Sequence, residues 1–555
     1  MSDDQGNNLG NLGNPWLKTP HIDRFANEAV YLSNFHQDIM CTQSRASLMT
    51  GKYALRTGAW RTSVGRSLMR TEEITIAEVF KESGYKTGHF GKWHLGDNWP
   101  FRPMDQGFDE VVQFKCGGIS QISDYWGNDY FDDTYYHNGE PKKYKGYCTD
   151  VFFNETIRFI KESKDEPFMI YLAPNIAHLP AIVGEEYSRP FEAKGHVKKQ
   201  AIYYGMITNL DENMGRLFAT LEEEGLSENT IVVYTTDDGT AGYAAQFDEE
   251  GLPLENGFNM GQRGGKGSTY EGGHRVFSYI KWPGGNIIGG KKVDALTSVT
   301  DIFPTLTDLC GIESSVSLNQ DGKSFKPALY GKNISGNESR VLFVSYLVPE
   351  KELDFKRNRF CVAGGDWRWI SRQELYNVKD DRAQKHNVAI KFPEIAKRLD
   401  QELESFLAKN AMEREIPVRF ILGDERAKTV QLTTQDLWGK SVFSQGQIEK
   451  LQDGNGGWKV DFKRSGKYRF TLSRYPLYTN LPFNYTKGNG KIPFNPDNAR
   501  LIVGGDKIEK TVNPRDNSVS MDVIIKKGQT DLVARITAPD GIDRPAYFVK
   551  VEYLD

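Results

Sequence analysis

The sequence contains no apolar run of transmembrane length, no internal repeat, no low-complexity tract and little net charge. A membrane-spanning helix needs about 20 consecutive apolar residues, so we expect no membrane span. The net charge of −4 excludes a generally basic surface, so we expect no nucleic-acid partner. The chain has 555 residues, 38% of them apolar and 26% charged, which is typical of a globular protein with two or more domains.

Helical and extended patterns alternate through the first 335 residues. The first predicted helix begins at Thr19-Pro20, and further helices are predicted over 75–83, 154–161, 201–224 and 301–310. Buried strands are predicted at 170–173 and 231–236, each after one of these helices. This alternation predicts an α/β fold with a mostly parallel central sheet between helices.

The pattern changes twice after residue 335. Short strands at 341–344 and 360–370 and an amphipathic helix at 394–409 predict a small antiparallel subdomain. Later, alternating runs such as 467–476 and 546–554 are separated by Gly, Asn and Pro clusters and predict a β-sandwich. The expected parts are a large α/β part over 1–335, a small α+β subdomain over 336–410 and a β-sandwich accessory domain over 411–555.

The segment that says most about chemistry is Cys-Thr-Gln-Ser-Arg-Ala-Ser-Leu-Met-Thr-Gly at 41–51. It resembles the activation motif of the type I sulfatases, formylglycine-dependent enzymes of the alkaline phosphatase superfamily, with Gln43 where the common form has Pro. The resemblance implies an arylsulfatase-like catalytic domain over 1–410 with an alkaline phosphatase-like fold. It also implies that a maturation enzyme oxidises Cys41 to formylglycine, which is an aldehyde.

A hydrated aldehyde gives this position two hydroxyl groups. One hydroxyl of the gem-diol attacks sulfur and releases the alcohol, and the other then loses its proton, rebuilds the C=O group and expels sulfate. A serine or threonine would instead leave a sulfate ester that water must attack directly. The residues from Arg45 to Met49 are predicted to form a short helix, whose N-terminus would direct partial positive charge at an anion.

Five other segments resemble the remaining sulfatase site motifs, in the family's order. They are Ser-Asp-Asp-Gln-Gly at 2–6, Gly84 to His94, Ile170 to His178, Ile231 to Gly239, and Arg-Gly-Gly-Lys-Gly at 263–267. Each segment alone is weak, because Asp-Asp before Gly is common in turns, a loop histidine is common at surfaces and Gly-Gly-Lys-Gly is common in flexible loops. Their combination favours a pocket assembled at the ends of strands.

The resemblance implies one divalent cation, held by Asp3, Asp4, Asp237, Asp238 and an oxygen of converted Cys41. Four carboxylates without a thiolate or imidazole ligand favour a hard ion, and Ca2+ is the family's usual cation. The cation would neutralise a sulfate oxygen and lower the pKa of the attacking hydroxyl. The family normally has Asn at the position of Asp238, so the extra charge should strengthen cation binding and weaken anion binding.

The other site residues take their roles from the same resemblance. Arg45 would orient and stabilise the gem-diol, and Lys92 and Lys266 would bind the sulfate oxygens and the charge that develops during transfer. His178 would act as general acid on the leaving oxygen, also contacting substrate. His94 would take the proton from the second hydroxyl when sulfate leaves.

The substrate is expected to be a sulfated carbohydrate rather than a simple aryl sulfate. Residues 117–140 are rich in aromatic and acidic side chains, which suit a sugar ring and its hydroxyls, although such a loop also orders itself by its own packing. Two other functions stay open. A phosphatase or phosphodiesterase of the same superfamily usually has a Ser or Thr nucleophile, and a non-enzymatic carbohydrate-binding protein would need only the C-terminal sandwich.

The N-terminus and the cysteines leave further alternatives. The first metal ligands are already the third and fourth residues, whereas the family has an apolar strand and a signal peptide before this point. We expect that the start is truncated or that Met1 is internal to a longer natural chain, and the resemblance implies a periplasmic or secreted protein. Cys116 and Cys148 could form a disulfide in an oxidising compartment or could both stay reduced.

Overall fold

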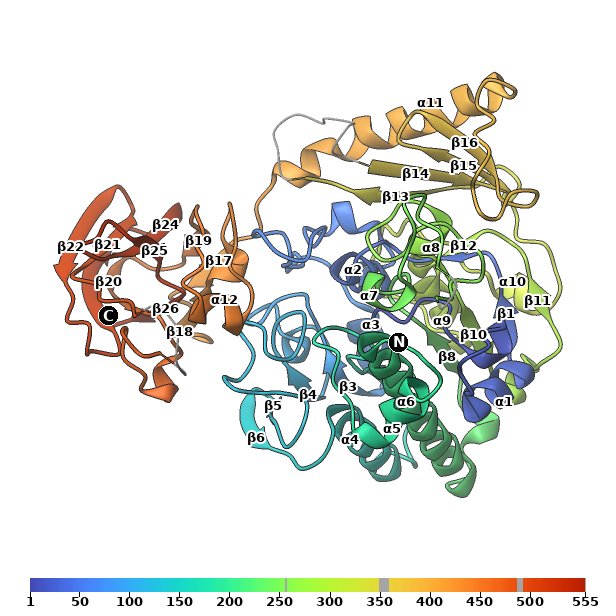
Figure 1. Ribbon diagram of the computed structural model, residues 1–555, viewed down its shortest axis with the longest axis horizontal. Coiled ribbons are helices and arrows are strands. Elements are labelled where there is room, and N and C mark those ends of the chain that lie inside the picture. The colour runs from blue at the N-terminus through green and yellow to red at the C-terminus, as the bar shows by residue number, and fades with distance from the viewer. Residues whose placement is uncertain (255–256, 349–358, 487–492, 555) are drawn as a thin grey trace.

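The computed structural model describes residues 1–254, 257–348, 359–486 and 493–554. A large α/β part carries a small antiparallel layer on one side, and the C-terminal β domain lies beside both (Figure 1). No helix in the described ranges is long and apolar enough to cross a membrane.

The centre of the α/β part is a five-stranded sheet in the order β6-β5-β4-β3-β7. Its strands are β3 (Lys86–Lys92), β4 (Glu110–Phe114), β5 (Thr134–His137), β6 (Glu140–Lys143) and β7 (Phe168–Ala173). Both neighbours of β3 run parallel to it, and the β5–β6 hairpin adds an antiparallel edge. The predicted parallel pairing is therefore confirmed for β4, β3 and β7, within a mixed sheet.

Two smaller sheets continue the α/β part. One has the order β11-β1-β10-β8 and the other the order β12-β2-β9. Their strands are β1 (Val30–Leu32), β2 (Phe35–His36), β8 (Val232–Thr235), β9 (Arg275–Val276), β10 (Ser278–Lys281), β11 (Lys292–Val293) and β12 (Thr297–Ser298). Ser2 pairs in parallel with Thr236, just beyond the end of β8, so the N-terminal residues lie where the central sheets meet.

The predicted helices all form, and local signals explain their ends. They are α1 (Pro20–Glu28), α2 (Cys41–Thr50), α3 (Ile76–Glu82), α4 (Cys148–Glu162), α5 (Glu185–Glu192), α6 (Lys198–Glu223), α7 (Gly242–Ala245), α8 (Glu271–His274), α9 (Ile302–Cys310), α10 (Lys326–Leu329), α11 (Pro393–Asn410) and α12 (Gln445–Glu449). Thr75 caps α3 in a reciprocal capping box with Glu78. Three helices begin earlier than predicted: α4 at Cys148, α6 at Lys198 and α2 at Cys41 itself.

The small subdomain is an antiparallel sheet covered by one helix. Its strands follow one another in chain order: β13 (Val341–Tyr346), β14 (Arg359–Gly364), β15 (Trp367–Ile370) and β16 (Glu374–Asn377). Leu399 and Leu403 of α11 share an apolar cluster with Val362 and Trp369 of the sheet. Helical spacing of its apolar residues thus places one face of α11 on the sheet.

The C-terminal domain consists of two sheets around one apolar cluster, which confirms the predicted β-sandwich architecture. One sheet has the order β17-β19-β24-β21-β22 with β25 beside β24, and the other the order β18-β26-β20-β23. The strands are β17 (Phe420–Leu422), β18 (Thr429–Thr433), β19 (Trp458–Phe462), β20 (Gly466–Ser473), β21 (Asn498–Val503), β22 (Asp506–Thr511), β23 (Val519–Ile525), β24 (Gly528–Thr537), β25 (Asp543–Pro545) and β26 (Phe548–Tyr553). On β20, Tyr468 and Phe470 are buried while Arg469 between them pairs with a surface carboxylate.

The sandwich packs tightly on the α/β part. Leu68 belongs to the apolar cluster of the sandwich, although it lies far from it in the sequence. Tyr125 stacks on Tyr478 with ring centres 4.8 Å apart, and Trp126 meets the edge of Tyr475 at 5.1 Å. In the aromatic loop that we expected to bind a sugar, these two rings therefore pack against the sandwich domain.

The disulfide alternative is settled for this structure. The thiols of Cys116 and Cys148 are both buried and free, and the other three cysteines are also free, with Cys310 partly exposed. Cys116 contacts the side chain of Gln435 in the sandwich, whereas Cys148 lies 3.9 Å from the hydroxyl of Thr149.

Candidate active site

The site is built around Cys41, which is the first residue of α2. Met40 before it is extended, and Gly51 ends the helix in the left-handed conformation with φ 69°. Every residue of α2 is buried, and Cys41 is only 2% exposed. Because the helix begins at Cys41 rather than at Arg45, its unpaired N–H groups and positive dipole end lie at the sulfur.

Gln43, the departure from the common motif, has a structural role. Its side-chain amide donates hydrogen bonds to the carbonyl oxygens of Trp60 at 2.9 Å and Ser345 at 3.2 Å. These bonds tie the first turn of α2 to two neighbouring segments. Proline has no side-chain amide, so these two contacts of the first turn of α2 depend on Gln43.

His94 faces the sulfur of Cys41 with an unprotonated nitrogen. Its Nδ1 lies 3.4 Å from the Cys41 sulfur, and its Nε2 lies 3.2 Å from the carbonyl oxygen of Thr62. A carbonyl can only accept, so Nε2 carries the proton and Nδ1 keeps its lone pair. Burial, and then the charges of Lys92 and Arg45, hold the pKa of His94 well below its usual range. The imidazole is therefore neutral and able to accept a proton.

Arg45 is fully buried and fixes the surrounding groups. Its guanidinium donates to Asp237 at 2.8 and 3.2 Å, to the carbonyl oxygen of Lys92 at 2.9 Å and to the hydroxyl of Tyr171 at 3.1 Å. Within the described part of the chain, no hydrogen bond of Arg45 reaches Cys41. The structure thus shows Arg45 as a group that positions Asp237 and the end of β3.

Four buried carboxylates converge beside the sulfur. One oxygen each of Asp4, Asp237 and Asp238 lie within 4.8 Å of one another, and Asp3 and Asp237 form a similar group with the Cys41 sulfur. Both side-chain oxygens of Asp238 are buried without a hydrogen-bond partner among the described residues. Buried carboxylate oxygens in this state fit a hard cation such as Ca2+, because an ion supplies the partner that the protein lacks.

Two lysines balance part of this charge. Lys92 donates to both oxygens of Asp3 at 2.8 and 2.9 Å, and Lys266 donates to Asp4 and lies 3.7 Å from Asp238. Burial alone would raise the pKa of Asp3, but the charges of Lys92, His178 and Arg45 together outweigh burial and lower that pKa. Burial, together with the neighbouring carboxylates, raises the pKa of Asp238 well above its usual value.

The charge of the site favours binding of a cation before binding of an anion. With all four carboxylates ionised, they and the three cations Arg45, Lys92 and Lys266 give a formal charge of −1 in a buried site, and a divalent ion makes it +1. A monoanionic ester would then meet a positive pocket. Asp238 points into this site, so its extra charge acts directly on the balance.

His178 follows β7 and is partly exposed. Its Nδ1 lies 2.6 Å from the carbonyl oxygen of Leu179, which fixes the proton on Nδ1 and leaves Nε2 as the titrating nitrogen. Burial, and then the charge of Lys92, lower the pKa of His178. The structure therefore brings together every residue predicted for the site: Asp3, Asp4, Cys41, Arg45, Lys92, His94, His178, Asp237, Asp238 and Lys266.

Comparisons with known proteins identify the family of this chain. A family model described as Sulfatase matches residues 1–312. The chain belongs to the sulfatase family. N-acetylgalactosamine-6-sulfatase of Canis lupus familiaris is 30% identical over 360 residues, which cover 60% of this chain and 66% of that protein. Steryl-sulfatase of Rattus norvegicus is 28% identical over 426 residues, covering 62% of this chain and 71% of the relative. The chain thus spans about two thirds of the length of these relatives.

Solved sulfatase structures share the fold. The crystal structure of Ps i-CgsB in complex with k-i-k-neocarrahexaose superposes with a TM-score of 0.64 at 25% identity, covering 73% of this chain and 91% of that one.

In this sulfatase family member, two glycines lie against the histidines of the site, and the sequence analysis did not identify them. A Cβ at Gly117 would lie 2.3 Å from the ring of His94, and one at Gly118 would lie 3.1 Å from the ring of His178. Both follow β4, so the Gly-Gly pair at the carboxyl end of a parallel strand was the available signal. Any side chain at Gly117 would displace His94 from Cys41.

A second buried cluster next to the site resembles a metal centre but is an ion-pair network. His36, Glu271 and His274 offer ligand atoms within 4.8 Å of one another. However, Glu271 already pairs with Arg368 at 2.6 Å and Arg275 at 2.8 Å. Two guanidinium groups on the only carboxylate disfavour a cation there, and the cluster instead supports the loop that carries Lys266.

Proposed function

We propose that this protein hydrolyses sulfate esters and that its substrate is a sulfated saccharide. The observation that carries the proposal is the position of Cys41, at the N-terminus of α2 and 3.4 Å from a neutral histidine nitrogen. Membership of the sulfatase family supports sulfate as the transferred group. The names of the galactosamine-6-sulfatase relative and of the carrahexaose complex support a saccharide.

Two groups would complete the chemistry. Asp3, Asp4, Asp237 and Asp238 would hold one divalent cation, for which we propose Ca2+, and when bound it would stabilise negative charge on sulfate and favour ionisation of the nucleophile. Formylglycine made from Cys41 by a maturation enzyme would supply, as its hydrate, the attacking hydroxyl and the second hydroxyl that releases sulfate.

The chain's own residues would bind the ester and move its protons. Lys92 and Lys266 would hold sulfate oxygens and the charge that develops on them. His178 would give its Nε2 proton to the leaving oxygen, and His94 would accept a proton at Nδ1. Arg45 would act on the hydrated aldehyde mainly through Asp237, which it holds with two hydrogen bonds.

The rim of the site supports an anionic saccharide. The guanidinium carbons of Arg61 and Arg359 lie 5.1 and 4.8 Å from the centre of the Tyr346 ring. Neither arginine has a carboxylate partner in the described ranges. Two unpaired cations around one aromatic ring suit a sugar that carries a second negative group.

This rim adjoins the reacting groups. Arg359 donates to the carbonyl oxygen of Gly267 at 3.2 Å, next to Lys266, and Arg61 precedes Thr62, which accepts from His94.

The remaining parts of the chain take supporting roles in the proposal. The β-sandwich over 411–555 is an accessory domain that supplies no reacting group, and the protein acts in the periplasm or after secretion.

A matched pair of esters tests the proposal. We would assay para-nitrophenyl sulfate against para-nitrophenyl phosphate, and then a panel of sulfated saccharides, with protein expressed beside a formylglycine-generating enzyme. Sulfate release should exceed phosphate release by orders of magnitude in kcat/KM. Preferential phosphate release would identify a phosphatase of the same superfamily. Saccharide binding without release of either anion would identify a binding protein.

A further inference from the structure

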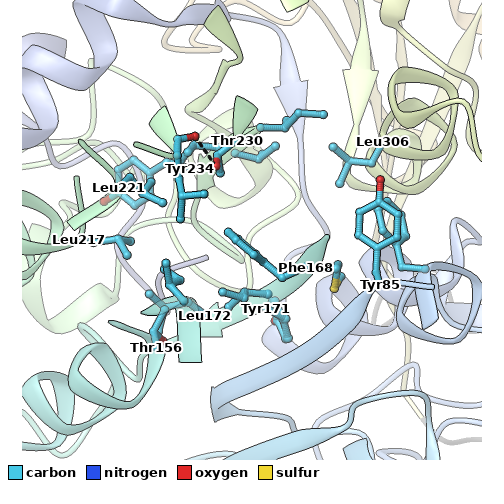
Figure 2. Close-up of a pocket in the computed structure, with 18 of the residues that line it drawn as sticks. Tyr85, Thr156, Phe168, Tyr171, Leu172, Leu217, Leu221, Thr230, Tyr234 and Leu306 are labelled. Carbon is cyan, nitrogen blue, oxygen red and sulfur yellow. Dashed lines mark hydrogen bonds between the residues drawn. The ribbon is translucent and has the colours of Figure 1, made fainter. Parts of the chain in front are cut away.

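One large cavity of the described chain lies away from the reacting groups. It has a volume of about 860 Å³, and its walls include Phe168 and Leu172 of β7 and Tyr234 of β8 (Figure 2). Its lining is mainly apolar, and none of the residues of the candidate active site belongs to it. The sugar that carries the sulfate ester is therefore bound by polar groups closer to Cys41.

Gln121 is such a group, because its side chain lies beside His178. A Cβ at Gly118 would lie 3.1 Å from the Cε1 and Nδ1 atoms of His178 and 3.2 Å from the Nε2 atom of Gln121. The amide and the imidazole thus border the same small space next to Gly118. The preceding glycine, Gly117, brings the same loop against His94. Gln121 is therefore carried by the loop that contacts both histidines of the site.

One hydrogen bond fixes the orientation of the Gln121 amide. The backbone N–H of Gly117 donates to Oε1 of Gln121 at 3.0 Å. Only an oxygen can accept this bond, so the other end of the amide is the NH2 group. That NH2 group has no hydrogen-bond partner among the described residues, and Gln121 is partly exposed. The loop therefore presents an oriented donor that a bound molecule can use.

The sandwich holds the backbone on both sides of this donor. The backbone N–H of Gln445 donates to the carbonyl oxygen of Ser120 at 3.3 Å, and its side-chain amide donates to that of Gln121 at 3.2 Å. The N–H of Ile122 donates to the carbonyl oxygen of Phe443 at 3.0 Å. These bonds form a short antiparallel pairing between the loop and the sandwich. The accessory domain thus fixes a side chain that borders a reacting group.

The donor lies on the side of the site from which the alcohol leaves. Cys41 and His94 are only 2% and 5% exposed, whereas His178 and Gln121 are both partly exposed. A sulfate group at Cys41 is therefore deep in the site, and the sugar extends outward past His178. The loop over 116–128 contains no lysine or arginine. A neutral donor in such a loop suits an uncharged acceptor, and the hydroxyl oxygens of a sugar are such acceptors.

We propose that Gln121 is a specificity-determining residue, whose NH2 group donates to a hydroxyl oxygen of the sugar that carries the ester. This inference rests on the proposed hydrolysis of saccharide sulfates. A free hydroxyl is already hydrogen-bonded to water, so the contact should contribute about tenfold to kcat/KM. It would distinguish sulfated sugars by the presence and orientation of that hydroxyl.

The test combines variants with modified substrates. The substrates are a sulfated monosaccharide and its monodeoxy analogues, each of which lacks one ring hydroxyl. Gln121→Glu keeps an oxygen for the N–H of Gly117 and removes the NH2 group, whereas Gln121→Met removes the NH2 group without adding charge. For both variants, the loss of kcat/KM should be about tenfold greater on the parent sugar than on one of the deoxy analogues. Gln529→Glu, at an exposed position of β24, is the control and should change neither.

Equal losses on the parent sugar and on every deoxy analogue would overturn the proposal. They would show that Gln121 acts on the ring of His178 or on the fold, because such effects do not depend on one hydroxyl. Unchanged kinetics in both Gln121 variants would overturn it as well.

Binding without turnover separates this proposal from the proposed function. In Cys41→Ala the intact ester can be titrated by calorimetry, and adding Gln121→Met should raise Kd about tenfold for the parent sugar but not for that deoxy analogue. If this difference appears although the wild-type protein hydrolyses no ester, the proposed function fails and the contact stands. Sulfate release by the wild-type protein without any such difference would overturn the contact alone.

Discussion

The Nδ1 atom of His94 lies 3.4 Å from the sulfur of Cys41, and the proton of that ring is fixed on the opposite nitrogen by the carbonyl oxygen of Thr62. His94 also has φ 62°, in the left-handed region that a residue with a side chain seldom adopts. Such strain persists only where the surroundings impose it and is frequent at functional sites. The base is therefore held toward residue 41 by its backbone, by Thr62 and by the space that Gly117 leaves.

His94→Ala should slow the release of sulfate more than the release of the alcohol. If Nδ1 removes a proton only in the second half of the reaction, the alcohol should still appear in a first burst of about one equivalent. Steady-state turnover should fall roughly 10²- to 10⁴-fold. Rapid-quench measurement of both products checks this, with His386→Ala at an exposed position as the control. Equal slowing of both products without a burst would place His94 in the first step.

His178→Ala should affect poor leaving groups most. A sugar alkoxide needs a proton on leaving and an activated phenolate does not, so kcat/KM should fall by roughly 10²-fold or more on sugar sulfates and little on para-nitrophenyl sulfate. Equal losses on both substrates would reject the role of general acid.

The same residue predicts a pH dependence. Burial and Lys92 lower the pKa of His178, and a general acid works only while it is protonated. Activity on sugar sulfates should therefore fall as pH rises through a value below about 6.5, the usual histidine pKa. The aryl sulfate should not show this limb. A profile that rises with pH on sugar sulfates would contradict the assignment.

Asp238→Asn should loosen the cation modestly and tighten anion binding. Its two oxygens have no hydrogen-bond partner in the described chain, but its charge opposes an incoming sulfate. We expect Ca2+ affinity to fall by about tenfold or less and the inhibition constant of free sulfate to improve, both by calorimetry and titration.

Asp237→Asn is the matched comparison, and we expect the opposite result: a large loss of cation binding and no gain in sulfate binding. Asp237 is held by Arg45, so its neutralisation leaves the buried guanidinium with only Asp3, at 3.7 Å, as a carboxylate partner in the described chain, at a cost of up to about 3–5 kcal/mol in unfolding free energy. Chelation of the wild-type protein should abolish activity, and Ca2+ should restore it. Complete loss of Ca2+ in Asp238→Asn would make that residue an essential ligand, and full activity after chelation would refute the cation assignment.

The sandwich should influence the site through the loop at 116–128. The Gln445 amide contacts Gly127, Gln121 and Tyr125 of that loop, and the same loop places Gly117 and Gly118 on the two histidines. Gln445→Ala should lower kcat/KM on saccharides several-fold and cost about 1–2 kcal/mol of stability. Ile524→Ala, on the exposed face of β23, serves as the control. Unchanged kinetics in a destabilised Gln445→Ala protein would show that the sandwich only supports the fold.

The sequence was sufficient to predict which residues lie together in the candidate site, because each of them lies inside a local motif. Cys41 heads α2, and Lys92 is the last residue of β3. Contacts between distant segments were not predictable in this way. The stacking of Tyr125 on Tyr478 joins residues 353 positions apart, so a loop that suits a sugar by composition instead packs between domains. The helix start at Cys41 was missed because Cys and Thr carry no strong helix preference and burial decides their conformation.

The measurement that tests the account most directly is sulfate release by the wild-type chain and by Cys41→Ala, each expressed with a formylglycine-generating enzyme and checked by the mass of the peptide that contains residue 41. The account predicts an aldehyde at position 41 in the active wild-type protein. It also predicts a loss of sulfate release to background in the variant, because no other residue of the site can form a gem-diol. Near-normal turnover by Cys41→Ala, or full activity of protein whose Cys41 remains a thiol, would contradict it.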